Sequence, residues 1–131
     1  MKFSTKTTYG LRAMIALASS KDQISLPIIA REEKISLGYL ERIFSKLKRA
    51  NLIKSEMGSK GGYSLAKPAD KIEVYDIISA LEGQLSPFHC VDESGKIYCR
   101  QSCKCGATKV LVKVQSVVNK ALKEIRLSDL V

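Results

Sequence analysis

Apolar residues recur at helical spacing in three stretches of the first fifty residues. The pattern predicts helices over about 5–20, 26–34 and 37–50, with Ser4 or Thr5 opening the first and Ser36 opening the third. Asn51 is the expected cap at the end of the third helix. We expect these residues to point into the core: Leu11, Met14, Ile15 and Ala18 in the first helix, Ile28, Ile29 and Ala30 in the second, and Leu37, Leu40, Ile43, Phe44 and Leu47 in the third.

After the third helix the period changes. Residues 52–56 and 63–65 have the pattern of two short strands, and the residues between them include a glycine-rich tip over 58–62 that tolerates positive φ. A fourth helix is predicted over 74–82. Three helices followed by a glycine-tipped hairpin describe a winged helix-turn-helix, in which the later helix enters the DNA major groove.

The last segment carries a long apolar stripe. Polar residues such as Gln115 and Asn119 are expected on its outer side. Additional valines widen the apolar surface beyond what one small core could cover, so we expect a homodimer in which these helices pack together. The expected seam consists of Leu111, Val114, Val118, Ala121 and Ile125.

The predicted fold is therefore mainly α with a small β-hairpin wing, a winged helix-turn-helix followed by a long C-terminal dimerisation helix. A chain of 131 residues is long enough for one compact core. We expect a DNA-binding part over 1–83, a cysteine-rich sensor loop over 84–106, and the dimerisation helix with its tail over 107–131. No stretch reaches the roughly 20 apolar residues of a membrane span, and the N-terminal apolar run is too short for a secretory signal. We expect a cytoplasmic protein with no membrane partner.

The net charge of +9 is unevenly distributed along the chain. Residues 1–67 hold 13 Lys and Arg against 5 Asp and Glu, whereas residues 68–131 hold 9 against 8. A basic N-terminal half suits double-stranded DNA, although a solvated basic face would have the same composition.

In this arrangement, the start of the third helix would read base edges, and Lys46 further along it would contact the DNA backbone. The wing tip would contact phosphate or the minor groove. Three-helix cores and glycine hairpins also occur without DNA, so the order of the elements and the charge carry the argument together. The candidate DNA-binding residues are Thr5, Lys6 and Thr8 in the first helix, Ser36, Gly38, Tyr39, Glu41, Arg42 and Lys46 in the third, and Ser59, Lys60 and Gly61 in the wing.

Four cysteines, Cys90, Cys99, Cys103 and Cys105, form the second signal. Thiolates are ligands of iron–sulfur clusters and of structural zinc, and the spacing does not match the paired Cys-x-x-Cys of zinc ribbons. A metal or cluster site is favoured, but the spacing leaves the metal open. The only histidine, His89, adjoins Cys90, and adjacent residues rarely form a nucleophile pair, so we do not expect an enzyme.

Four motifs are spread over nearly the whole chain. They are Ile35-Ser36-Leu37-Gly38-Tyr39-Leu40-Glu41 with Phe44-x-x-Leu47, Gly58-x-x-Gly61-Gly62-Tyr63-x-Leu65, Ile77-Ile78-x-Ala80-Leu81-Glu82-Gly83, and Leu127-Ser128-Asp129-Leu130. Together they resemble the motifs of one family, the IscR/NsrR/CymR-like bacterial winged-helix transcription regulators. The resemblance implies a sequence-specific transcription regulator, and we expect it to act as a repressor.

The resemblance to the cluster-binding members implies that Cys90, Cys99 and Cys105 hold an iron–sulfur cluster, 2Fe–2S in preference to 4Fe–4S. Such a cluster would sense iron–sulfur, redox or nitric-oxide status. The chain departs from the family at the fourth ligand, because Thr108 stands at the histidine position of IscR-type members and Thr8 falls near the acidic ligand of NsrR-type members. Cys103 is the local candidate for that ligand.

A further departure lies in the wing, where Met57 occupies an arginine position, so the DNA sequence that is read is expected to differ. Other interpretations stay open. The same regulator fold could use a zinc site or a thiol switch, or could act as a CymR-like regulator of cysteine metabolism without a cluster. From a different class, the chain could be a small electron-transfer or cluster-carrier protein.

Overall fold

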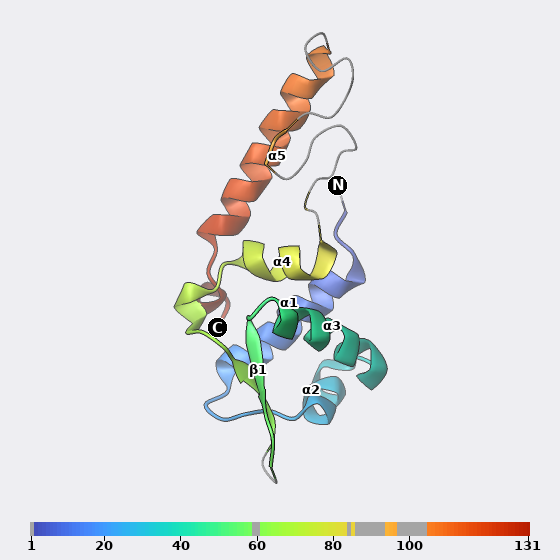
Figure 1. Ribbon diagram of the computed structural model, residues 1–131, viewed down its shortest axis with the longest axis vertical. Coiled ribbons are helices and arrows are strands. Elements are labelled where there is room, and N and C mark those ends of the chain that lie inside the picture. Colours follow the sequence, from blue (N-terminus) through green and yellow to red (C-terminus); the bar gives the residue numbers. More distant parts are fainter. Residues whose placement is uncertain (1, 59–60, 84, 86–93, 97–104) are drawn as a thin grey trace.

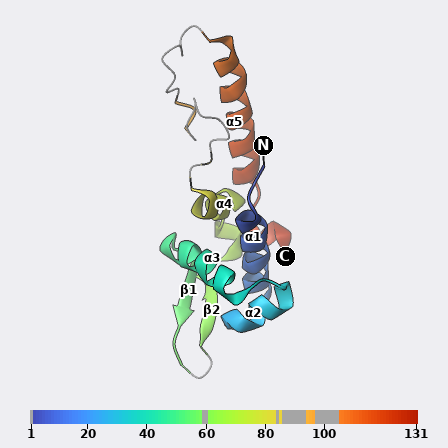
Figure 2. The same ribbon diagram turned by 90° about the vertical axis from the view of Figure 1, so that its right-hand side faces the viewer.

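The computed structural model describes residues 2–58, 61–83, 85, 94–96 and 105–131. Figures 1 and 2 show the β-hairpin at one end of the molecule and the start of the last helix at the other, with α4 between them. The elements are α1 (Thr5–Ser19), α2 (Leu26–Glu33), α3 (Leu37–Arg49), β1 (Ile53–Glu56), β2 (Gly62–Leu65), η1 (Ala69–Lys71), α4 (Val74–Glu82), α5 (Gly106–Glu124) and η2 (Leu127–Leu130).

The order of the elements confirms the predicted fold class. Ser36 caps α3, because its hydroxyl accepts a hydrogen bond from the Tyr39 amide at 3.4 Å. Asn51 follows the end of α3 with a φ of 58°, the left-handed conformation that commonly ends helices. The last helix begins at Gly106, directly after Cys105, and is therefore longer than its apolar stripe alone indicates.

A third backbone segment pairs with the hairpin, a contact that the sequence did not predict. Strands β1 and β2 pair antiparallel from Ile53 with Leu65 to Glu56 with Gly62. Ile24, between α1 and α2, bridges Tyr63 through two backbone hydrogen bonds of 3.0 and 2.8 Å. A Cβ on Gly62 would lie 2.6 Å from the Ile24 carbonyl oxygen, so this close backbone approach requires glycine.

Two side chains expected in the core are exposed instead. Ile28 is 40% exposed, because the buried positions of α2 are Leu26, Ile29 and Ala30, and helical spacing puts residue 28 on the opposite face. Leu37 is 41% exposed at the first position of α3, one turn before the buried stripe begins at Leu40.

The buried face of α1 is also rotated from the expected one. Met14 is buried, but Leu11, Ile15 and Ala18 are only half-buried at its margin. This face is small at Gly10, where the Leu81 side chain of α4 approaches closely. The buried residues of the face are Thr7, Gly10, Ala13, Met14 and Leu17.

Helix α5 is turned relative to the expected seam. Gln115, expected outside, is 1% exposed, and its side-chain amide donates to the Leu85 carbonyl at 2.7 Å and to the Asn119 side chain at 2.9 Å. Because this side faces the rest of the chain, the exposed apolar side lies further round, with Val110 at 63% and Val117 at 54% exposure. The exposed apolar stripe consists of Val110, Val117, Ala121 and Ile125, with the half-buried Val114 between them.

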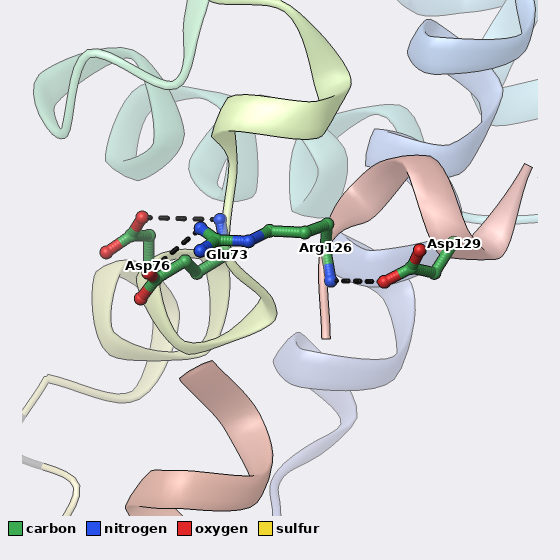
Figure 3. Close-up of polar contacts among 4 residues, drawn as sticks. All are labelled: Glu73, Asp76, Arg126 and Asp129. Carbon is green, nitrogen blue, oxygen red and sulfur yellow. Dashed lines mark hydrogen bonds and ion pairs between the residues drawn. The ribbon is translucent and has the colours of Figure 1, made fainter. Parts of the chain in front are cut away.

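The C-terminal tail returns to the start of α4 (Figure 3). Arg126 donates to the Glu73 carboxylate at 2.9 Å, and its amide donates to Asp129 at 2.8 Å. The amide of Glu73 donates in turn to Asp76 at 3.4 Å. With Leu127 fully buried in the main core, these contacts fix the end of α5 against the winged helix.

Within the described ranges, no helix combines the length and the apolar character that crossing a membrane requires.

Candidate DNA-binding surface and cysteine segment

The N-terminal part of α3 presents small, polar and charged side chains to solvent, beside the exposed Leu37. Ser36, Gly38, Glu41 and Arg42 are exposed, while the opposite face of the helix packs into the core. A Cβ built on Gly38 meets nothing within 4 Å, so packing within the chain does not require glycine there. The bare backbone at this position leaves room for a partner to approach closely.

Tyr39 is held in place by an aromatic contact with α1. Its ring meets the Tyr9 ring edge-to-face, with centroids 5.7 Å apart and planes at 87°. The Arg12 guanidinium lies 5.8 Å from the centroid of the Tyr9 ring and pairs with Glu33 of α2 at 2.8 Å. Sequence reasoning missed these three supporting residues, because each is unremarkable in its own helix pattern and they meet only through the tertiary fold.

The candidate residues of α1 border the same surface. Thr5 and Thr8 are exposed, and Thr5 precedes Tyr9 by one helical turn, so it shares the face that contacts α3. Lys6 is half-buried and lies close enough to Glu82 to lower the pKa of that carboxyl.

The Glu82 carboxylate caps the start of α1. It accepts hydrogen bonds from the Ser4 amide at 2.9 Å, from the Ser4 hydroxyl at 2.5 Å, and from the Thr7 hydroxyl. Burial raises the pKa of Glu82, but the hydrogen bonds and the charge of Lys6 outweigh burial and hold the pKa below its usual value. The sequence motif contains Glu82, but nothing in it signals this partner.

Two basic residues in the last turn of α3, Lys46 and Lys48, have partners within the chain. The Lys46 ammonium donates to the Leu81 carbonyl in the last turn of α4 at 3.3 Å. Lys48 donates to the Ser55 hydroxyl on β1 at 2.7 Å. Lys46 was expected at the DNA backbone, and the structure places its ammonium group against α4.

The wing is fixed beside α3 by Phe44 and Tyr63, whose rings meet edge-to-face at 4.8 Å. Near the tip, the Gly61 amide donates to the Gly58 carbonyl at 2.8 Å, and Gly58 has a φ of 132°. Met57 is fully exposed. The candidates Ser59 and Lys60 lie outside the described residues.

Cys105 immediately precedes α5, where its side chain is partly exposed. The other three candidate ligands, Cys90, Cys99 and Cys103, lie outside the described residues, as does His89. Within the part of the chain that is described, no three potential metal ligands gather.

Thr108, at the position of the IscR-type histidine, is buried and its hydroxyl donates to the Cys105 carbonyl at 2.7 Å. The Cys105 thiol has the chemistry of a cluster ligand. The Thr108 hydroxyl does not take the place of the histidine imidazole as a ligand.

Comparisons with known proteins find relatives that match nearly the whole chain. The sequence model of the Rrf2 family, described as an iron-dependent transcriptional regulator, matches residues 3–131. The IscR regulator of Cereibacter sphaeroides is 41% identical over 93 residues, which are 68% of this chain and 60% of that protein. The CymR regulator of Bacillus subtilis is 35% identical over 132 residues, which are 99% of this chain and 89% of that protein.

Solved structures agree with the sequence comparison. The structure of CymR, named the global cysteine regulator of B. subtilis, has a TM-score of 0.81 and 35% identity, and the match covers 99% of this chain and 95% of that one. The IscR structure from T. potens has a TM-score of 0.79 and 35% identity, with coverage of 99% and 85%. These relatives are named as regulators and not as enzymes, in agreement with the sequence prediction. The chain belongs to the Rrf2 family of transcriptional regulators.

Proposed function

We propose that the protein is a homodimeric repressor that binds a specific DNA sequence through α3 and the hairpin. One observation carries this proposal: Ser36, Glu41 and Arg42 are exposed around the open position of Gly38 at the start of α3, in a basic half of the chain. A helix presented in this way fits the major groove, where each base pair has a distinct pattern of donors and acceptors.

In this arrangement Tyr39 and Arg42 reach base edges or phosphates from the groove side of α3. The aromatic contact with Tyr9 restrains Tyr39, so less conformational entropy is lost on binding. Thr5 and Thr8 donate to the DNA backbone beside α3. Lys60 at the wing contacts phosphate or the minor groove, with Ser59 and Gly61 beside it.

The open apolar stripe of α5 supports dimerisation. Val110 and Val117 are more than half exposed on a helix whose opposite side is covered by the chain. Packing two such stripes together would remove this apolar surface from water, which favours association. Two heads related by twofold symmetry would meet half-sites about one helical turn, or a multiple of it, apart.

The experiment is selection of a duplex from a random library, followed by binding measurements at several salt concentrations. The proposal predicts a twofold-symmetric selected sequence and a steep salt dependence. Lys60→Ala should weaken binding to every duplex and reduce the salt slope by about one. No enrichment of any duplex over a scrambled one would contradict the proposal, and an unchanged slope in Lys60→Ala would remove the wing from the phosphates.

For the signal, we propose that Cys90, Cys99 and Cys105 hold an iron–sulfur cluster, with Cys103 as the fourth ligand. When bound, such a cluster supplies a centre that responds to oxidants, iron supply or nitric oxide. The IscR relatives and the partly exposed thiol of Cys105 support this reading.

A second candidate is a regulator without a cluster, using a thiol switch or zinc. It is favoured by Thr108, whose hydroxyl is engaged with a backbone carbonyl, and by the CymR relatives that match nearly the full chain. Anaerobic purification with absorption spectroscopy and analysis of iron, sulfide and zinc separates the candidates, because clusters are coloured and zinc is not. A colourless protein without iron and sulfide that regains neither on anaerobic reconstitution would contradict the cluster.

A further inference from the structure

The last turn of α4 contacts both α1 and α3. The Leu81 carbonyl accepts the Lys46 ammonium of α3 at 3.3 Å. The Leu81 side chain packs against Gly10 of α1 so closely that a Cβ there would lie 2.1 Å from its Cδ1 atom. The neighbouring Glu82 caps the start of α1 through Ser4 and Thr7.

These contacts supply hydrogen-bond partners to backbone groups at the helix ends. The final carbonyls of a helix and its first amides have no partner within the helix. Lys46 supplies a donor at the negative end of α4, and Glu82 supplies an acceptor at the positive end of α1, so both charges also suit the helix dipoles. The relative positions of the three helices are therefore set at one turn.

The cysteine segment, the predicted sensor loop over 84–106, begins directly after the last turn of α4. Gly83 ends α4 with a φ of 81°, and two residues later the Leu85 carbonyl accepts the Gln115 amide of α5 at 2.7 Å. Figures 1 and 2 show that the start of α5, next to Cys105, lies at the far end of the molecule from the hairpin. Chemistry at Cys105 therefore needs a structural connection to act on α3.

We propose that the last turn of α4 is this connection and that Lys46 is a positioning residue, not a phosphate contact. Lys46 sets the placement of α3 relative to the turn from which the cysteine segment departs, and Glu82 does the same for α1. The inference rests on the proposed function and names how the DNA-binding surface is regulated. It differs from the sequence prediction, which placed Lys46 at the DNA backbone.

The two roles of Lys46 predict different salt dependence. The full-length dimer is titrated with the selected duplex and with a scrambled duplex, using Lys46→Gln, Lys46→Arg and the control Arg42→Gln. As a positioning residue, Lys46→Gln lowers affinity for the selected duplex about tenfold, the scale of a lost hydrogen bond to a charged group. It leaves the scrambled duplex and the salt slope unchanged, and Lys46→Arg restores the selected binding.

As a phosphate contact, Lys46→Gln would instead weaken both duplexes alike and reduce the salt slope by about one. Arg42→Gln, on the exposed face of α3, should show that reduction and calibrates the measurement. If Lys46→Gln behaves like Arg42→Gln, the positioning role is overturned while the proposed function stands. If the wild type does not distinguish the two duplexes, the proposed function itself fails.

The connection to the cysteines is tested by alkylating the folded protein with iodoacetamide and confirming the modified residues by mass spectrometry. Alkylation should change the affinity of the wild type for the selected duplex and should change that of Lys46→Gln by a clearly smaller factor. An equal change in the two proteins, or no change in the wild type, would overturn transmission through this turn.

Discussion

The ring of Phe44 in α3 meets the ring of Tyr63 in β2 edge-to-face, with centroids 4.8 Å apart and planes at 81°. Phe44 is fully buried, and the backbone amide and carbonyl of Tyr63 both form hydrogen bonds with the backbone of Ile24. The contact therefore fixes the angle between α3 and the hairpin from within the core. A rigid pairing of this kind would let α3 and the hairpin meet DNA as one surface in the proposed function.

A double-mutant cycle measures this contact. Phe44→Leu and Tyr63→Leu keep apolar side chains but remove the aromatic pairing, and we expect a coupling free energy of about 0.5–1.5 kcal/mol in urea denaturation. The paired change should also weaken binding to the selected duplex more than to a scrambled one. Fully additive effects would mean that the rings merely fill space independently.

Two helical glycines make a matched pair for a stability test. A Cβ at Gly10 would overlap the buried Leu81 side chain, whereas a Cβ at Gly38 meets nothing. We expect Gly10→Ala to lower the free energy of unfolding by about 1–3 kcal/mol, because overpacking outweighs the better helix propensity of alanine. Gly38→Ala should leave stability unchanged or higher and should weaken DNA binding. A stability loss in Gly38→Ala would contradict the open surface described for α3.

The cap at Glu82 predicts a pH dependence. Since hydrogen bonds from Ser4 and Thr7 hold the folded pKa of Glu82 below its usual value, the carboxylate stabilises the fold fully above the unfolded pKa of about 4.3. This stabilisation is lost as the pH falls through the lowered folded pKa. The stability difference between wild type and Glu82→Gln should therefore be constant from pH 6 to 8, and shrink below about pH 4.3. A difference that grows on acidification would refute the cap.

The tail contacts predict a contrast between a buried and an exposed group. Leu127→Ala should cost about 2–5 kcal/mol, because it opens a cavity in the main core. Arg126→Met removes a partly exposed ion pair with Glu73 and should cost about 1 kcal/mol or less. Chemical denaturation of both variants tests the order, and equal losses would show that the tail is held by charge as much as by burial.

The order of elements was predictable, because the spacing of apolar residues changes where helices give way to strands. The buried stripe of α3 and the cap at Ser36 follow from local pattern alone. The rotation of α5 did not, because Gln115 is buried by pairing with the Leu85 carbonyl, and a polar residue at helical spacing predicts a solvent face.

Some features of the candidate site could also be predicted from the sequence, and others could not. Exposed residues in the first turn of α3 were found from position in the motif, and the structure places them on one surface. The partner of Lys46 was not predictable, because a basic residue near the end of a helix has the same sequence signature whether it contacts phosphate or a neighbouring carbonyl. Tyr9 and Glu82 likewise act through contacts that are long-range in sequence.

The most direct test of the account is the discrimination of single base pairs by Tyr39→Ala. Affinities of wild type and variant are measured for the selected duplex and for duplexes carrying each base-pair change across one half-site, at fixed salt. We predict that the variant loses about 1–3 kcal/mol of discrimination at one or two adjacent positions and keeps its salt slope. Unchanged discrimination at every position would contradict the placement of the first turn of α3 in the major groove.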